Sequence, residues 1–342
     1  FDKQRNVELV DAASPYKLNQ YLYLSEEKEY TPLTAKVSPG PVGAVSGSLV
    51  IEASTLRSQI KTTLTLYSNI DRIDIANEVT KTPSSEPTQI YFVFPFNVPD
   101  RVYHYEATGA IIKPGLTQHG GEQLKGSGQS SHSCRSFVDV SNDKYGVTLS
   151  MSDSYLVQFG HPTTFESPTQ LDPFNSTILS LAMVNKNYRE FIRDQGGISN
   201  FVFRYAIQGH AEGFKGHSAV RFGWEWSNEL LVKTLPLDQT GSLPPMSHSF
   251  LSCSPENVVV TALKVAEEGL EKGLILRAWE TDGRTTIVSF DISALGALSA
   301  AKTDLLERDR EDLTLSKGKV SVSVPARGFV TVRLRDGSRV VI

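Results

Sequence analysis

The chain has 342 residues, a formal net charge of -4 and a pI near 6.0, with 39% hydrophobic and 21% charged residues. This length can bury one large core and one smaller core, and the composition is ordinary for a globular protein. Because Lys and Arg are not in excess, we do not expect nucleic-acid binding, and no apolar run approaches the ~20 residues that span a bilayer.

The chain alternates apolar and polar residues with the period of a β-strand. In residues 60–66 and 73–79 the alternation places Thr62 and Asn77 on the apolar inner face. The run from Tyr91 to Phe96 is rich in aromatic and β-branched residues, and its proline either ends the strand or marks an edge strand. Further strands are predicted at 146–151, 201–208, 258–265, 274–280, 285–290, 320–324 and 330–334, and the one candidate helix is 178–192.

Two stretches interrupt these strands. Residues 109–133 are rich in Gly, Ser, Gln and His, which favours a long surface loop. Residues 236–245 are polar and proline-rich, which favours a linker. The pattern therefore predicts an all-β protein with a larger sandwich domain at 1–235, a linker at 236–245 and a small β-sandwich at 246–342.

The cysteines and histidines give no clear metal or disulfide pattern. Cys134 and Cys253 are too far apart for a metal or redox motif, so we expect unpaired thiols, which favours a cytoplasmic location. His119, His132 and Cys134 share one loop and carry zinc-accepting groups, with His104 the nearest further candidate. Zinc usually needs four ligands, or three and a water, and we predict no metal site in this chain.

Tryptophan and arginine residues near the middle of the chain could face a sugar. In Trp224-Glu225-Trp226, alternation puts both indoles on one side of a strand, where core or interface packing is a commoner role than sugar stacking. Arg204 lies between Phe203 and Tyr205, so strand alternation points it to the opposite face of the sheet.

A series of short segments resembles the C-terminal region of glycoside hydrolase family 38, the α-mannosidases. The most specific runs from Ala262 to Gly269 and then from Leu274 to Glu280. Weaker matches occur in the expected order at 1–3, 8–11, 19–23, 70–74, 92–96, 137–141, 145–147, 183–188, 195–197 and 203–205. The resemblance implies a β-supersandwich, galactose mutarotase-like, followed by a smaller β-sandwich.

The resemblance also implies that much of the enzyme lies outside this chain. The family's catalytic α/β barrel, zinc ligands, aspartate nucleophile and helical linker come before the segment at which this chain starts, at Phe1. The opening strands of the supersandwich are expected to be missing too, which would leave an unpaired sheet edge. We therefore assign no catalytic residue and no cofactor to this chain, and expect zinc in the missing N-terminal barrel.

The implied function is the C-terminal β portion of a zinc-dependent retaining α-mannosidase. It would supply scaffold, part of the active-site rim and oligomer contacts for hydrolysis of α-mannosides or oligosaccharides, in which two carboxylates about 5 Å apart act in turn. Alone it should not cleave glycosides. In the final domain, structural roles are expected for Arg277, Trp279 and Glu280, and a solvated turn for 307–312.

Substrate contacts are expected at Asn185, Asn187, Tyr188 and Arg204, because amides, phenols and guanidinium groups suit sugar hydroxyls. The family carries an asparagine-rich aromatic motif at the first three positions. Here Lys186 interrupts the asparagines and Tyr188 replaces a common tryptophan. In the alternative interpretation the asparagines satisfy backbone groups at a turn, and Arg204 makes a salt bridge at a domain interface.

Two other functions remain open from the sequence. The chain could be a carbohydrate-binding module that acts without a catalytic domain. It could also be a mutarotase-like sugar epimerase, which needs a histidine and a glutamate facing one sugar carbon. His104 and Glu225 are the residues to replace in a test of the epimerase, although no histidine lies on a confident inner-strand position.

Overall fold

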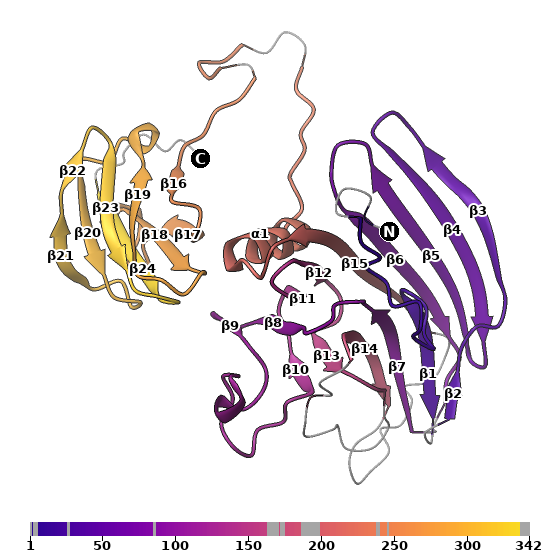
Figure 1. The fold of residues 1–342 in the computed structure, drawn as a ribbon. Helices are drawn as coiled ribbons and strands as arrows, with labels where there is room; N and C mark the ends of the chain where they lie inside the picture. The colour runs from indigo at the N-terminus through magenta and orange to yellow at the C-terminus, as the bar shows by residue number, and fades with distance from the viewer. Residues whose placement is uncertain are drawn as a thin grey trace. The chain divides into compact units, whose positions relative to one another are not determined.

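The structure is a computed structural model that describes residues 2, 6–25, 28–84, 87–162, 171, 175–185, 199–236, 240–244 and 246–335. It divides into two compact units, Phe1–Phe214 with Phe222–Glu229, and Lys215–Arg221 with Leu230–Ile342. Each unit is built almost entirely of antiparallel strands (Figure 1). No helix among the described residues is both long and apolar enough to cross a membrane.

The first unit contains two antiparallel sheets. The six-stranded sheet has the order β10-β13-β14-β7-β1-β2. Its strands are β10 Ser131–Ser133, β13 Leu156–Phe159, β14 Thr177–Asn185, β7 Thr88–Pro95, β1 Gln20–Ser25 and β2 Lys28–Tyr30. The nine-stranded sheet has the order β3-β4-β5-β6-β15-β12-β11-β8-β9. Its strands are β3 Ala35–Val42, β4 Ser46–Thr55, β5 Ser58–Tyr67, β6 Ile73–Lys81, β15 Ser199–Ala211, β12 Tyr145–Met151, β11 Phe137–Ser141, β8 Val102–Ala107 and β9 Ala110–Ile112.

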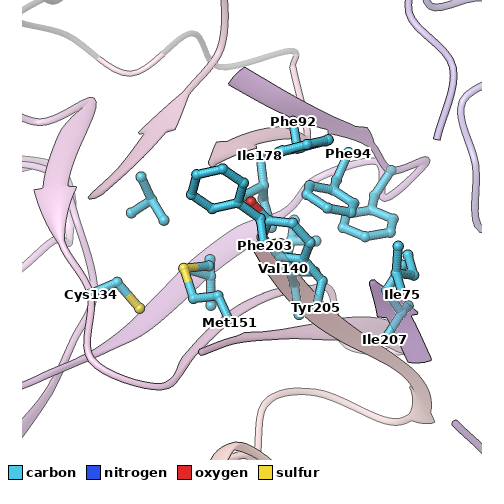
Figure 2. Close-up of a cluster of buried hydrophobic side chains, with 14 of the residues drawn as sticks. Ile75, Phe92, Phe94, Cys134, Val140, Met151, Ile178, Phe203, Tyr205 and Ile207 are labelled. Atoms are coloured by element: carbon cyan, nitrogen blue, oxygen red, sulfur yellow. The ribbon is translucent and has the colours of Figure 1, made fainter. Parts of the chain in front are cut away.

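An aromatic core fills the space between these two sheets. Phe92 of β7 lies against the rings of Phe203 and Tyr205, with centroid distances of 5.8 and 5.6 Å (Figure 2). The ring of Tyr21 is also a neighbour, with its centroid 5.6 Å away. Alternate residues of most contributing strands point into this core, and a bulge in β14 lets the adjacent Ala182 and Met183 both pack against it. Strand β7 is apolar on both faces because a second cluster, with Leu22, Tyr91 and Leu179 among its members, buries the other side of the six-stranded sheet.

One polar group of this core was predicted on the inner face and is found there. Asn77 of β6 is fully buried and exchanges two amide hydrogen bonds with Asn19, at 2.9 and 3.0 Å. The Thr62 hydroxyl donates a third, at 2.7 Å, to the Asn77 side-chain oxygen. Because its amide is satisfied, Asn77 can be buried without the penalty of an unpaired polar group.

The second unit is a smaller sandwich of two sheets. The four-stranded sheet comprises β16 Ser252–Ser254, β19 Thr286–Asp291, β23 Lys319–Val324 and β22 Leu315–Ser316, in that order. The five-stranded sheet comprises β17 Val258–Val265, β18 Leu274–Glu280, β24 Phe329–Arg335, β20 Ser299–Thr303 and β21 Asp309–Leu313. Alternate apolar residues of both sheets, such as Leu276, Phe290, Val322 and Val332, form its core.

The all-β prediction is confirmed, and each predicted strand matches an observed one to within a few residues. The predicted loop at 109–133 contains β9 and a single 3-10 turn, η1 Thr117–His119, before β10 begins. Two further 3-10 turns, η2 Leu270–Lys272 and η3 Ser293–Leu295, connect strands of the second unit.

Two local predictions were wrong. The described part of 178–192 is a strand, β14, whose residues are apolar on both faces because each face packs on a core; such runs carry no clear period. Conversely, Trp224-Glu225-Trp226 belongs to a helix, α1 Gly216–Ser227, and not to a strand. Ala219, Phe222 and Trp226 have helical spacing, but the glycines and the local Trp-Glu-Trp alternation obscured it.

Candidate functional site

The outer face of the nine-stranded sheet, which is the face turned away from the aromatic core, gathers buried polar side chains. In β8, β11, β12 and β15 the core-facing residues include Tyr105, Val138, Leu149 and Tyr205. Strand alternation therefore turns the residues next to them outward. The outward residues form two polar clusters, each around one buried carboxylate.

The first cluster is centred on Asp139 of β11, which is 1% exposed. It accepts hydrogen bonds from the hydroxyls of Ser141 and Thr148, both at 2.7 Å, and its other contact is His210 Nε2 at 2.8 Å. A Cβ atom on Gly146 would lie 2.6 Å from that nitrogen, so the imidazole needs a glycine beneath it. The cluster fixes a partly exposed imidazole against a buried carboxylate.

The second cluster is centred on Glu106 of β8, whose side chain is fully buried. The indole Nε1 of Trp224 donates to both carboxylate oxygens, at 3.0 and 3.2 Å, and the Ser136 hydroxyl also donates to this carboxylate. Arg135 lies 3.6 Å from Glu106, and its guanidinium sits over the Trp224 ring at 5.3 Å. Because no solvent reaches Glu106, we interpret this cluster as structural: it anchors Trp224 to the sheet.

Burial raises the pKa of Glu106, and this shift predicts a pH effect on stability. The folded protein binds the proton more tightly than the unfolded chain does. The stability from this group is therefore complete below the ordinary pKa of 4.5 and is lost as the pH rises through the folded pKa. Glu106→Gln cannot titrate and keeps an acceptor for Trp224. We expect the free energy of unfolding of Glu106→Gln, compared with that of the native chain, to increase as the pH rises.

Urea unfolding of both proteins at a series of pH values measures this difference. Glu225→Gln, at an exposed position of α1, is the matched control and should follow the native chain at every pH. A Glu106→Gln variant whose stability runs parallel to that of the native chain would show that the buried carboxyl is not titrating as expected.

Each tryptophan of the predicted pair carries an arginine over its ring. Trp226 carries the guanidinium of Arg72 over its ring at 5.1 Å, and the same guanidinium lies 5.4 Å from the Tyr67 ring centroid. Arg72 is held by two hydrogen bonds to Asp74, at 2.6 and 3.1 Å. As residues i and i+2 of a helix, the two tryptophans point to different sides, and each ring is engaged by an arginine.

Arg204 is on the outer face of β15, as the alternation predicts, and it is already paired. Its Nε and Nη2 lie 3.0 Å from the two oxygens of Asp153, and Glu229 is 3.5 Å away. The hydrogen bonds with Asp153 raise the pKa of Arg204. Both acidic partners belong to the first unit, so the ion pairs of Arg204 lie within that unit.

Of the four predicted substrate contacts, Asn185 and Arg204 are among the described residues, and they lie on strands of different sheets. Asn185 is the last residue of β14, where its backbone pairs with Thr88 of β7. Arg204 points away from the six-stranded sheet that contains β14, because its neighbours Phe203 and Tyr205 face that sheet. Asn187 and Tyr188 lie outside the described residues.

Two of the residues considered as zinc ligands, His132 and Cys134, have other contacts. The His132 ring stacks on Tyr105 with centroids 4.7 Å apart, and burial lowers the pKa of His132. Cys134 is buried, its thiol donates to the Phe137 carbonyl at 2.9 Å, and burial raises its pKa. In the part of the chain that the structure describes, no group of three or more His, Cys, Asp and Glu residues could hold a metal ion.

Sequence comparison identifies the family. The profile of the "Glycosyl hydrolases family 38 C-terminal domain" matches residues 10–167, and that of the "Glycosyl hydrolases family 38 C-terminal beta sandwich domain" matches residues 257–329. The two profiles occur in chain order, one on each unit. The chain belongs to glycoside hydrolase family 38. It carries the C-terminal domains of that family.

Solved family 38 structures share the fold. An alpha-mannosidase from Enterococcus faecalis V583 matches with a TM-score of 0.66 and 12% identity, over 93% of this chain and 38% of that chain. A family 38 protein from Enterococcus faecalis gives a TM-score of 0.67 and 12% identity, over 93% and 40%. The chain thus spans about two fifths of the length of these relatives. None of the curated proteins compared with it matches.

The two carboxylate clusters were missed in the sequence, although a partial signal exists. Asp139 lies between Val138 and Val140, so a short apolar-polar alternation is present there, although no strand was predicted at this position. Its partner His210 is 71 positions away, and only the pairing of β11 and β15 with β12 brings the two residues together.

Proposed function

We propose that this chain is the C-terminal β portion of a zinc-dependent, retaining α-mannosidase that acts on α-mannosides or oligosaccharides. The observation that carries the proposal is the ordered pair of family 38 C-terminal domains on one chain. The fold shared with a solved alpha-mannosidase supports it. In this proposal the zinc ion and the two reacting carboxylates belong to an N-terminal catalytic barrel outside this chain.

The chain's own contribution would be scaffold and part of the active-site rim, with a larger domain at 1–235, a linker at 236–245 and a small sandwich at 246–342. The buried clusters around Glu106 and Asp139 suit a scaffold, because satisfied polar networks fix one arrangement of strands. Among the proposed sugar contacts Asn185, Asn187, Tyr188 and Arg204, the arginine would have to share its donors with Asp153.

Hydrolysis of an aryl α-mannoside tests the proposal. We expect the purified 342-residue chain to release no nitrophenol. The longer protein, expressed from its complete gene, should release it, lose activity to a chelator and regain it with zinc, and give the α-anomer as first product in proton NMR. Hydrolysis by the 342-residue chain alone, or no hydrolysis by the zinc-loaded longer protein, would contradict the proposal.

Titration of the isolated chain with mannose and mannobiose separates the alternative of an independent carbohydrate-binding module. We expect no saturable binding at millimolar sugar, because the rings of Trp224 and Trp226 are each engaged by an arginine. Millimolar or tighter binding would favour the module. A putative aldose 1-epimerase from Escherichia coli K12 aligns with a TM-score of only 0.32, which carries no argument for the epimerase.

A further inference from the structure

Two loops close the outer face of the five-stranded sheet in the second unit. The strand registers place Ile275, Arg333 and Ala301 side by side on this face, where they point away from the sandwich core. All three are nevertheless buried. The covering loops are residues 266–272, between β17 and β18, and residues 304–308, between β20 and β21. They form a third layer on this unit.

Buried polar contacts join the two loops to each other and to the sheet. The Arg333 guanidinium donates to the Glu268 carboxylate at 3.1 Å and to the Lys272 carbonyl at 3.1 Å, both in the 266–272 loop. It also donates to the Glu307 carbonyl in the 304–308 loop. The buried Glu307 carboxylate in turn accepts a hydrogen bond from the Glu267 N–H at 2.8 Å. The two loops are therefore held together as one surface.

The 304–308 loop is also fixed from within. The Asp304 carboxylate accepts hydrogen bonds from the backbone N–H groups of Leu306 and Arg308, at 2.9 and 3.0 Å. The side chains of Arg308 and Arg310 donate to the same carboxylate at 2.8 and 2.7 Å. Glu307 has a φ of 64°, a left-handed conformation that residues other than glycine rarely adopt unless their surroundings impose it. The loop therefore has its conformation before any partner binds.

These fixed loops hold three leucines in solvent. Leu270 is 57% exposed, Leu305 is 61% exposed and Leu306 is 73% exposed. Single apolar residues scattered over a surface are ordinary, but three of them on two joined loops form an apolar patch, which is typical of an interaction site. A loop that is already ordered loses little conformational entropy when it binds. We call Leu270, Leu305 and Leu306 the leucine surface.

The exposed charges beside the leucine surface have opposite signs on the two loops. The 266–272 loop exposes three acidic side chains and one basic side chain, which are Glu267, Glu268, Glu271 and Lys272. In and just after the 304–308 loop, the exposed Arg308 and Arg310 share the single carboxylate of Asp304, while Glu307 is buried. A two-fold axis through the leucine surface would place the acidic loop of one copy against the basic loop of the other.

We propose that the leucine surface is where two copies of this protein associate about a two-fold axis. The leucines of both copies pack together, and Glu271 of one copy lies near Arg308 of the other. The two loops have fewer residues than the roughly 20–30 that each partner gives to a stable interface, so we expect a dissociation constant of about 1–100 μM. This inference goes beyond the proposed function, because it needs no catalytic residue and concerns assembly alone.

Sedimentation equilibrium of the 342-residue chain, over concentrations that span this range, tests the proposal. Leu306→Gln should raise the dissociation constant of the dimer at least about tenfold, because it puts a polar amide into the centre of the contact. Ile287→Gln is the matched control. Ile287 is 74% exposed but lies on the outer face of the four-stranded sheet, so its replacement should leave the constant unchanged. Urea unfolding should give the native stability for both variants, since both side chains are exposed.

Glu271→Lys tests the two-fold arrangement. It should also raise the dissociation constant, and this effect should fade at high salt because exposed charges are screened there. A chain that stays monomeric at every concentration, or that dimerises equally well as Leu306→Gln, would overturn the proposal. Unchanged dimerisation of Glu271→Lys at low salt would overturn the two-fold pairing of the loops. A longer polypeptide that stays monomeric while the 342-residue chain dimerises would overturn the proposal in favour of a surface covered within one polypeptide.

Discussion

Glu280→Ala should strongly destabilise the second unit. The carboxylate of Glu280 is fully buried and accepts five hydrogen bonds of 2.8 to 3.1 Å, from the Asn257 amide and the backbone N–H groups of Asp282, Gly283, Arg284 and Arg327. A buried donor left without an acceptor costs about 1–3 kcal/mol, and the Asn257 amide is buried while the four backbone donors are partly buried. We therefore expect a loss of about 4 kcal/mol or more, which is a large part of the 5–15 kcal/mol that stabilises a typical domain.

Hydrogen exchange followed by mass spectrometry would measure the effect unit by unit. Peptides from β18 and β24 should lose their protection in Glu280→Ala, while peptides from β6 and β15 in the first unit keep theirs. Protection in Glu280→Gln should lie between that of the native chain and that of Glu280→Ala. The Gln side chain keeps one acceptor oxygen, but its amide nitrogen is a donor and cannot accept the remaining hydrogen bonds. Glu311→Ala, at an exposed position of β21, is the control and should leave protection unchanged. Native protection in β18 of Glu280→Ala would refute this role.

The segment that contains Glu280 shows which parts of the fold can be predicted from sequence. Alternation placed 274–280 in a strand, and the structure gives the same bounds for β18. Most of the predicted strands carry a local signal, which is either an alternation of apolar and polar residues or a run of aromatic and β-branched residues. Helix α1 and strand β14 lack that signal: α1 includes two glycines, and β14 is buried on both faces.

The candidate site was less predictable than the fold because its contacts join distant residues. Glu106 and Trp224 are 118 positions apart, and the hydrogen bond between them depends on where α1 lies on the sheet. Arg204 was correctly directed to the outer face, since alternation is local. Its partner Asp153 is 51 positions away and carries no sequence signal that links the two.

Phe92→Ala should be the most damaging single change to the core of the first unit. The Phe92 ring is fully buried and has three aromatic neighbours: Tyr21 from its own sheet, and Phe203 and Tyr205 from the facing one. Truncation removes the contacts that join the two sheets and leaves a cavity that neighbouring strands, fixed by their hydrogen bonds, cannot close. We expect a loss of about 3–5 kcal/mol in the free energy of unfolding.

Urea unfolding of the 342-residue chain, with hydrogen exchange in β7 and β15 to assign the transition, checks this value. Phe92→Leu keeps most of the volume and should cost about 1.5 kcal/mol or less. Phe201→Ala is the matched control, because Phe201 also stacks on Phe203, with centroids 6.3 Å apart, but is 37% exposed. If Phe92→Ala and Phe201→Ala cost the same, the two sheets are not held together mainly through this ring, and the cohesion of the sandwich must be spread over its other strands.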